Sequence, residues 1–517
     1  MSDDTLPHSW VWTTLGEICS HPQYGYTTKA AESGDTLFLR TTDITSGKID
    51  WATVPYCAES PEDPDKYQLY DGDIVISRAG SVGFSYLVQA PPKAVFASYL
   101  IRFRPFVDRN YFALFLKSPF YWRAISDSKS GIAVGNVNAQ KLAAITIPLP
   151  PLAEQKRIVA KIEELFSELE AGEASLRKAR RQLGVYRQSL LKQAFEGKLT
   201  QKWRTQNPDK LESPTALLAR IQSARQSRHE QLLEEWKTAV KEWESAETEE
   251  KRPPKPQKLI PISETIAVFD TPLPESWTAL NLSQFVLELG QGWSPKCENR
   301  EAQGDEWSVI KTTAIQLGNF DPSANKALPK HLPPRRWLGL RSGEILITRA
   351  GPRSRCGVVC RVRADHPRLM ICDKAYRLVL FEGATSAEFL ELLLCSPAAT
   401  TAIEKLKTGI SDSGVNITQS AFLQLALPIP PLAEQQEIVR LLDEQFEAIE
   451  RNERELDAAL KRSEALRQSI LKRAFAGRLV PQDPADEPAA QLLARLRTER
   501  EQSDKSSARR RTTKGVQ

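Results

Sequence analysis

Two short segments of the sequence place an arginine between a β-branched run and a glycine: ISRAG around Arg78 and ITRAG around Arg349. A guanidinium offers five N–H donors in a planar fork, which suits phosphate oxygens and the acceptor edge of guanine. A salt bridge that stabilises the end of a strand is the alternative role. Because the same residue types occur at both places, we expect the two arginines to share one role.

The sequence does not contain the motifs of the methyltransferases, nucleases and ATP-driven motors that act on DNA. A DNA methyltransferase of the amino type should show an NPPY-like motif and a glycine-rich cofactor loop, and GSVG at 80–83 does not have the required spacing. The P-loop pattern of ATP-driven motors is also missing. The tripeptide at 154–156 has the ExK spelling of a nuclease, but its repeat at 434–436 reads EQQ. We therefore predict a protein that is not an enzyme.

Cys356, Cys360, His366 and Cys372 are residue types that suit a zinc ion. Their spacing is not a usual zinc pattern, so we expect core cysteines here and no metal. The seven cysteines of the chain are odd in number and scattered, which favours a reducing, cytoplasmic setting over a disulfide framework.

The composition is that of a globular protein with several domains. The chain has 517 residues, too many for one core, and its net charge is only +5. A surface that binds nucleic acid must therefore come from local clustering of cations. The apolar runs are too short for a membrane span, and the acidic, polar start does not resemble a signal peptide, so we expect no membrane partner.

An internal repeat organises the sequence. PPLAEQ at 150–155 returns at 430–435, and RQSLLKQAFEGKL at 187–199 returns as RQSILKRAFAGRL at 467–479. The segments before each copy correspond more weakly, for example DGDIVISRAG with SGEILITRAG. The chain therefore consists of a globular unit and a conserved segment, followed by both again.

Each conserved segment is expected to form one long helix, which starts after a Pro-Pro pair and stops near Gly197 or Gly477. Apolar residues at alternating steps of four and three form a heptad seam, so the two helices are expected to pair as an antiparallel coiled coil. Packing of each helix on its own domain is the alternative. Polar residues of the second seam, Gln445, Asn452 and Ser463, would fix the register. The predicted apolar seam consists of Ile158, Ile162, Leu165, Leu169, Leu176, Leu183 and Leu190 in the first helix and of Ile438, Leu442, Ile449, Leu456, Leu466 and Ile470 in the second.

The globular units mix short β-branched runs with turns, and each has a helical stretch, near 110–126 and near 386–406. We predict an α+β fold with two pseudo-repeated domains, each a twisted sheet plus helices. The predicted boundaries are 1–147 and 269–427 for the globular domains, 148–199 and 428–479 for the helices, 200–268 for a helical extension alongside the first helix with a Pro/Lys linker, and 480–517 for a C-terminal helix with a basic, disordered tail.

Two variable domains that alternate with helices beginning PLPPLAEQ and ending QSLLKQAFEGKL resemble the specificity subunit of type I restriction-modification systems. The resemblance covers nearly the whole chain, and its specific part lies in the helical motifs. It implies that each globular unit is a target recognition domain for one half of a bipartite, asymmetric DNA site. It also implies that the helices set the distance between the two halves.

The resemblance further implies partners. Two methylation subunits would dock on the helices, motor-nuclease restriction subunits would join them, and the complex would methylate adenine in double-stranded DNA and restrict it. S-adenosylmethionine and ATP would then belong to the partner subunits, with no cofactor in this chain. A related defence or regulatory complex with a different effector is one alternative, and a coiled-coil scaffold that does not bind DNA is another.

Residues at matching places in both units are the candidates for DNA contact. The loops GYTTK (25–29) and GWSPK (292–296) each combine an aromatic residue, a hydroxyl and a lysine after a glycine. Two further pairs are either phosphate contacts or strand residues, and the arginines after Arg349 form either a contact cluster or a solvated loop. The candidates are Tyr26, Thr27, Lys29, Thr41, Thr42, Arg78, Trp293, Ser294, Lys296, Lys311, Thr312, Arg349, Arg353 and Arg355.

Overall fold

The computed structural model describes residues 6–129, 137–245, 255–256, 258–259, 266–267, 272–381, 383 and 385–498. The chain forms two compact units. The first unit comprises Met1–Lys178 with Leu456–Gln517, and the second comprises Ala179–Glu455. Both boundaries fall inside a long helix, whereas the predicted boundaries lie at the helix ends. Each unit therefore contains one globular domain and part of both long helices.

The two conserved segments form the long helices α6 (Leu152–Phe195) and α13 (Leu432–Phe475), each of 44 residues. Each helix begins directly after its Pro-Pro pair, where a missing N–H costs nothing. Gly197 and Gly477 follow the helix ends with φ of 72° and 68°, a left-handed conformation that glycine adopts without strain. The prediction of two long helices at these positions is confirmed.

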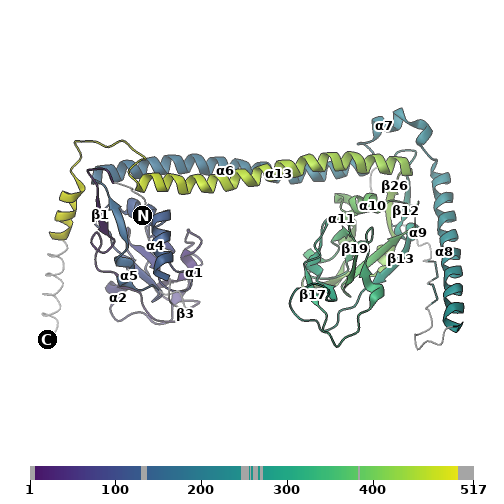
Figure 1. The fold of residues 1–517 in the computed structure, drawn as a ribbon, viewed down its shortest axis with the longest axis horizontal. Helices are drawn as coiled ribbons and strands as arrows, with labels where there is room; N and C mark the ends of the chain where they lie inside the picture. The colour runs from purple at the N-terminus through teal and green to yellow at the C-terminus, as the bar shows by residue number, and fades with distance from the viewer. Residues whose placement is uncertain are drawn as a thin grey trace. The chain divides into compact units, whose positions relative to one another are not determined.

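The domain of the first unit is built on two four-stranded sheets (Figure 1). One sheet has the order β2 (Gln23–Tyr24), β9 (Leu100–Phe103), β6 (Ile74–Ser77), β7 (Ser85–Leu87), with antiparallel neighbours. The other has the order β3 (Ala30–Ala31), β5 (Tyr56–Cys57), β4 (Leu37–Leu39), β8 (Ala94–Phe96), in which β4 and β8 are parallel. A two-stranded ribbon of β1 (Val11–Thr14) and β10 (Thr146–Leu149) leads into α6. The helices are α1 (Thr41–Ile44), α2 (Pro64–Tyr67), α3 (Arg109–Phe115), α4 (Pro119–Lys129) and α5 (Ala139–Ala143).

The domain of the second unit repeats this plan. Its sheets have the orders β13-β23-β19-β21 and β17-β14-β22-β18, the latter again with one parallel pair, β14 and β22. The ribbon before the helix is β12 (Thr278–Asn281) with β26 (Leu425–Ile429), joined by β11 (Ile266–Ala267). The α+β fold class with two pseudo-repeated domains is thus confirmed. The sheet strands are β13 (Val286–Gln291), β23 (Ala375–Leu380), β19 (Ile345–Thr348), β21 (Val359–Arg361), β17 (Asn325–Ala327), β14 (Ser308–Ile310), β22 (His366–Met370) and β18 (Gly339–Leu340).

The remaining described elements of the second unit are the 32-residue helix α8 and several shorter elements. Two small sheets pair β15 (Ile315–Gln316) with β16 (Asn319–Phe320), and β25 (Gly414–Asn416) with both β20 (Ala350–Gly351) and β24 (Thr408–Ser411). The helices are α7 (Gln201–Gln206), α8 (Pro214–Ser245), α9 (Leu282–Phe285), α10 (Ala387–Leu394), α11 (Pro397–Lys405) and α12 (Gln419–Leu423), with 3-10 turns at Pro208–Lys210, Thr312–Ala314, Arg336–Leu338 and Arg353–Arg355.

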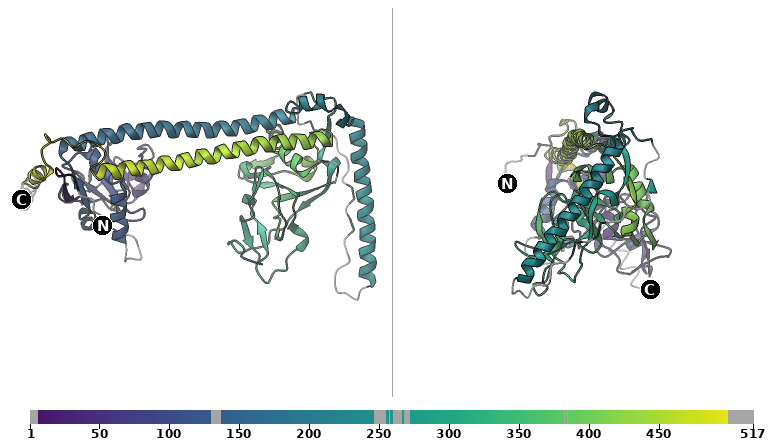
Figure 2. Two further views of the ribbon diagram at one scale, coloured as in Figure 1. Left: turned by 45° about the horizontal axis from the view of Figure 1, so that its top comes forward. Right: turned by 90° about the vertical axis from the view of Figure 1, so that its right-hand side faces the viewer.

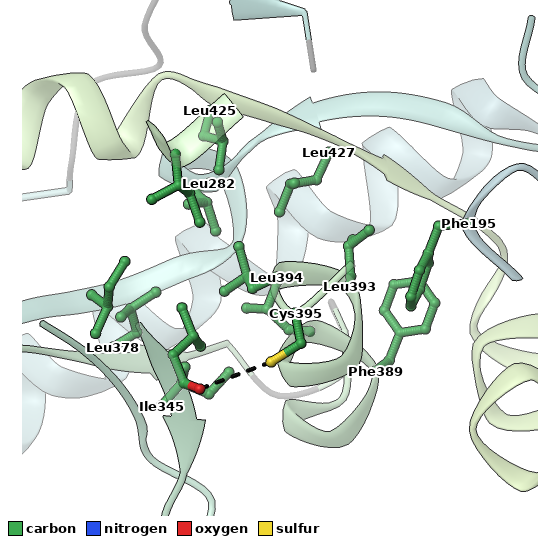
Figure 3. Close-up of a cluster of buried hydrophobic side chains, with 14 of the residues drawn as sticks. Phe195, Leu282, Ile345, Leu378, Phe389, Leu393, Leu394, Cys395, Leu425 and Leu427 are labelled. Carbon is green, nitrogen blue, oxygen red and sulfur yellow. Dashed lines mark hydrogen bonds between the residues drawn. The ribbon is translucent and has the colours of Figure 1, made fainter. Parts of the chain in front are cut away.

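The C-terminal end of a long helix completes the core of each domain. In the second unit, Phe195 of α6 is fully buried against Phe389 of α10, with ring centroids 5.6 Å apart (Figure 3). In the first unit, Phe475 of α13 lies 5.2 Å from Tyr111 and 5.4 Å from Phe115. The phenylalanine of the repeated AF-G motif is therefore a core residue in both units.

The long helices run antiparallel to each other within each unit (Figure 2). In the first unit, Glu173 of α6 accepts hydrogen bonds from Ser463 Oγ at 2.7 Å and Arg467 Nε at 3.2 Å. In the second unit, Arg187 of α6 stacks on Phe446 of α13 at 4.3 Å. The early part of each helix thus contacts the late part of the other, as expected for an antiparallel pair.

The predicted seam is wrong at Leu466, whose side chain is 52% exposed. Arg467 is 17% exposed and occupies the seam in its place. Gln445 and Asn452 are likewise exposed, and Phe446 is buried instead of Gln445. The buried positions Ile438, Leu442 and Phe446 follow one another at two consecutive steps of four residues, where the predicted heptad has a step of four and then one of three. An α-helix has 3.6 residues per turn and a heptad repeat assumes 3.5, so an additional step of four shifts every second seam position by one residue from there on. Of the other predicted seam residues, Ile158, Ile162, Leu190, Ile438, Leu442 and Ile449 are buried, and Leu165, Leu169, Leu176, Leu183, Leu456 and Ile470 are half-buried.

The helical extension α8 was expected to lie alongside α6. It instead packs on the globular domain of its unit. Leu217 and Ile221 are buried in the core of that domain, and Arg220 donates a hydrogen bond to the carbonyl of Gly383. Figures 1 and 2 both show α8 beside the sheets of the second unit. The first turns of α8 thus contribute to the core of the domain.

Part of the predicted linker and tail lies outside the described residues, including 246–254 and 499–517. Before that tail, residues 489–498 are helical, and Leu492, Leu493 and Leu496 are buried in the core of the first unit. Among the described residues, no helix is long and apolar enough to cross a membrane.

Candidate nucleic-acid interface

Arg78 opens a closed loop between β6 and β7, here called the first arginine loop (residues 77–84). The Ser77 hydroxyl donates to the carbonyls of Ser81 and Phe84, the latter at 3.2 Å. Gly83, with φ of 93°, donates its N–H to the Ser77 carbonyl at 2.9 Å. The side chain of residue 77 and the glycine therefore hold the loop shut, which fixes the backbone of Arg78.

The second arginine loop (residues 348–358), between β19 and β21, is closed in the same way. The Thr348 hydroxyl donates to the Arg355 carbonyl at 2.5 Å, and Gly357, with φ of 81°, donates its N–H to the Thr348 carbonyl at 2.7 Å. The second loop is longer but keeps a hydroxyl residue at its start and a left-handed glycine near its end. Both units therefore present an arginine from the same kind of loop.

Both arginine side chains are half-buried and lie against a tyrosine. The Arg78 guanidinium lies 5.1 Å from the ring of Tyr24, and that of Arg349 lies 5.5 Å from the ring of Tyr376. Arg349 Nε also donates to the Asp373 carbonyl at 2.8 Å. Among the described residues, neither guanidinium has a carboxylate within 4 Å, so the strand-end salt bridge is not found. Arg78 Nε is buried and has no hydrogen-bond partner among the described residues.

The glycines of GYTTK and GWSPK permit a close approach of two backbone segments. A Cβ added to Gly25 would lie 2.2 Å from the Ala97 carbonyl oxygen, and one added to Gly292 would lie 2.1 Å from that of Ile371. The aromatic residues that follow are thereby held against their domains. Tyr26 lies 5.3 Å from the ring of Tyr67, and the Arg335 guanidinium lies 4.4 Å from the ring of Trp293. Thr27, Lys29, Ser294 and Lys296 of the two loops are exposed.

A pocket of about 320 Å³ in the second unit brings three predicted candidates together. Ser294, Lys311 and Thr312 line it, although they come from separate segments. Lys326 and Lys374 also line it and were not predicted, because only strand pairing and the fold of the chain bring them here. Asp373 is the carboxylate of the pocket and accepts a hydrogen bond from the Ser294 hydroxyl. The lining therefore carries more cations than anions, as a phosphate-binding surface requires.

Thr41, Thr42 and Thr312 are not strand residues, which corrects one of the predicted alternatives. Thr41 and Thr42 open α1, where Asp43 accepts hydrogen bonds from the backbone N–H and the guanidinium of Arg40. Thr312 opens a 3-10 turn after Lys311. Their hydroxyls therefore belong to turns at the ends of strands β4 and β14.

The loop of Arg353 and Arg355 is partly exposed to solvent, as one of the alternatives predicts, but both arginines have partners within the protein. Arg353 forms ion pairs with Glu404 at 2.6 Å and Asp412 at 2.8 Å. Arg355 Nη2 donates to the carbonyls of Thr312 and Ile315, both at 2.7 Å. These two arginines therefore tie the second arginine loop to its neighbours, and Arg355 also positions the turn that carries Thr312.

The repeated PPLAEQ motif holds a buried polar contact that the sequence did not reveal. Trp10 Nε1 donates to Glu154 at 3.0 Å in the first unit, and Trp277 Nε1 donates to Glu434 at 2.9 Å in the second. Burial raises the pKa of Glu154, and the hydrogen bonds from Trp10 and Gln482 oppose that rise. The sequence could have indicated this contact, because the tryptophan recurs in LPHSW and LPESW and the glutamate recurs in both copies of PPLAEQ.

The four residues considered for zinc do not form a cluster. Cys356 and Cys360 are buried in different hydrophobic clusters, and His366 lies 5.7 Å from the ring of Phe320. Burial raises the pKa of the Cys372 thiol to about 11, so it remains protonated at neutral pH. Within the described ranges, no group of three or more His, Cys, Asp or Glu is placed to hold a metal ion.

The family model described as "Type I restriction modification DNA specificity domain" matches residues 7–176 and 384–462. The chain is similar to two specificity subunits of type I restriction enzymes. It is 29% identical to that of EcoEI from Escherichia coli over 58% of this chain and 45% of that protein. It is 25% identical to that of EcoKI from Escherichia coli (strain K12) over 99% of this chain and the full length of that protein.

A solved structure with a similar fold comes from a study of complex assembly and conformational transition in the type I R-M system. It matches with a TM-score of 0.58 at 19% identity, covering 92% of this chain and all of that one.

Proposed function

Because the chain belongs to the family of type I restriction-modification specificity subunits, we propose that its two units read the two halves of one bipartite DNA site. One observation carries this proposal: both domains keep the same scaffold contacts but differ in the residues around their arginine loops. Glu154 and Glu434 each accept a hydrogen bond from a tryptophan indole. The first arginine loop, in contrast, has Ser81 where the second has an arginine-rich turn at 353–355. Unlike surfaces on one scaffold predict unlike half-sites.

Arg78 and Arg349 are the residues that we assign to DNA contact in both units. Their loops are closed and their guanidiniums lie against tyrosine rings, so little side-chain entropy is lost on binding. In the second unit, Lys311, Lys326 and Lys374 add cations for the phosphate backbone.

The long helices serve as spacer and as docking surface for partners. We propose that two methylation subunits bind them, that motor-nuclease subunits join this core, and that adenine methylation and restriction take place on those partners. S-adenosylmethionine and ATP would bind to the partners, and this chain would act without catalysis of its own. We expect the complex to work on double-stranded DNA in the cytoplasm.

The test is single-molecule methylome sequencing of cells that express this chain with its methylation subunit. A split motif with two unlike halves and a constant gap, present only when the chain is expressed, is the expected result. Cells that express the methylation subunit alone are the control. An active, bound methylation subunit that produces no new methylation would contradict the proposal.

A further inference from the structure

The second unit exposes a segment that the proposed interface has not used. Residues 330–337, KHLPPRRW, are here called the basic segment. It contains Lys330, Arg335 and Arg336, and no acidic residue occurs from 322 to 343. Trp337 is 71% exposed, the most exposed of the large hydrophobic residues in the described part of the chain. Lys330 and Arg336 are also exposed, and neither has a carboxylate within 4 Å among the described residues.

The first unit carries an acidic segment at the same place, residues 59–66, ESPEDPDK. A buried arginine on the central sheet identifies the equivalence. Arg102 donates to the carbonyls of Lys66 at 3.1 Å and Gln68 at 2.7 Å. Arg377 donates to the carbonyls of Trp337 at 3.2 Å and Gly339 at 3.5 Å. Alignment of DGDIVIS (71–77) with SGEILIT (342–348) pairs Lys66 with Trp337 and Asp65 with Arg336.

Both segments also lie against the glycine-aromatic loop of their own unit. Tyr67, the residue after the acidic segment, packs on Tyr26, and Arg335 of the basic segment stacks on Trp293. The residue after Trp293, Ser294, lines the cationic pocket. The basic segment therefore extends the candidate interface of the second unit, while the first unit presents carboxylates at the corresponding place.

We propose that the basic segment is an additional DNA-binding element that the second unit has and the first unit lacks. Lys330 and Arg336 bind backbone phosphates, and the Trp337 indole packs against deoxyribose and base edges in the adjacent groove. The four carboxylates of the acidic segment repel phosphate, so the first unit holds its half-site without this contact. The inference rests on the proposed reading of DNA by both units.

The experiment measures DNA binding by the full chain in complex with its methylation subunits, on the site that methylation mapping identifies. Arg336→Ala is compared with Asp65→Ala, the matched position of the first unit. Loss of one phosphate contact in Arg336→Ala should lower the slope of log affinity against log salt by about 0.9, whereas Asp65→Ala should not weaken binding. Both residues are exposed, so the thermal unfolding of both variants should match the parent.

Trp337 is tested by its salt dependence and by conservative replacement. Trp337→Ala should weaken binding by about tenfold without a change in the salt slope, and Trp337→Phe should retain most of the affinity. Unchanged affinity and slope in Arg336→Ala and Trp337→Ala, with the parent complex bound to its site, would overturn this inference. Failure of the parent complex to bind or methylate DNA would instead contradict the proposed function.

Discussion

At the scale of single residues, two buried glutamates explain why PPLAEQ occurs twice. Each accepts a hydrogen bond from a tryptophan indole of its own domain and so joins the start of a long helix to that domain. Glu434 also accepts from Thr200 and Arg204, which follow the end of α6. The glutamate thus connects three segments of one unit, a role that requires its charge to be buried and fully paired.

Replacement of Glu434 should therefore destabilise the second unit strongly. Glu434→Ala leaves Arg204 and the Trp277 indole without their acceptor, at a cost of about 3–5 kcal/mol in the free energy of unfolding. Urea unfolding followed by tryptophan fluorescence measures this loss. Gln436→Ala, two residues away and exposed, is the matched control and should change the free energy by less than about 0.5 kcal/mol. Equal stability of the two variants would disprove the role of Glu434.

Arg78 should contribute to DNA binding and little to stability. Arg78→Ala removes the donors of the first arginine loop and should weaken DNA binding by about 1–3 kcal/mol. The binding assay uses the complex with its methylation subunits and the mapped DNA site. Arg123→Ala, an exposed arginine of the same domain on α4, is the control and should bind as the parent does. A large drop in melting temperature for Arg78→Ala would indicate a structural role instead.

At the scale of elements, the helix pair depends on a seam that mixes apolar and charged residues. Ile438, Leu442 and Ile449 bury one part of α13, whereas Ser463 and Arg467 bind Glu173 in another. An apolar seam alone would leave the choice of register open, because leucines can slide past one another. The polar contacts therefore give the pair one register.

The shifted seam makes a direct prediction for two leucines of α13. Leu442 is fully buried, so Leu442→Ala should cost about 2–4 kcal/mol in the free energy of unfolding. Leu466 is 52% exposed, so Leu466→Ala should cost less than about 0.5 kcal/mol. Urea unfolding of both variants compares them directly. A similar cost at both positions would support the strict heptad seam instead.

The contact of Glu173 predicts a loss of stability in acid. Hydrogen bonds from Ser463 and Arg467 lower the pKa of Glu173 below its usual value near 4.5. A lowered pKa contributes stability above the unfolded pKa, and this contribution is lost as pH falls below about 4.5. Glu173→Gln should therefore flatten the dependence of the melting temperature on pH in that range. Glu168→Gln, exposed on the same helix, should leave it unchanged.

At the scale of the whole molecule, the repeat makes one chain carry two readers that differ in charge. The basic segment at 330–337 and the acidic segment at 59–66 occupy the same place in two domains of the same fold. A symmetric dimer of one reader could not combine these surfaces. Duplication within one chain therefore permits an asymmetric DNA site.

The spacer role predicts a separation of gap length from base identity. Insertion of one helical turn at matched positions of α6 and α13 should change the gap between the half-sites and leave their bases as they are. Exchange of residues 1–147 for another recognition domain should change one half-site only. Methylome sequencing reads both results. A change of bases on helix insertion would contradict the role of the helices as a spacer.

The repeat, the two long helices and the resemblance to the family could be predicted from the sequence, because helix periodicity and the PPLAEQ and AF-G motifs are local patterns. The sequence also singled out Arg78 and Arg349 as candidates for DNA contact, because each follows a β-branched run beside a glycine at a matching place of its unit. The tertiary structure alone decided which helix end enters which core, and that α8 packs on its domain. It also decided the register after Leu442, the junction at Glu434, and the convergence of Ser294, Lys311, Lys326 and Lys374. These features depend on contacts between segments far apart in the chain, where packing and the pairing of buried charges override local pattern.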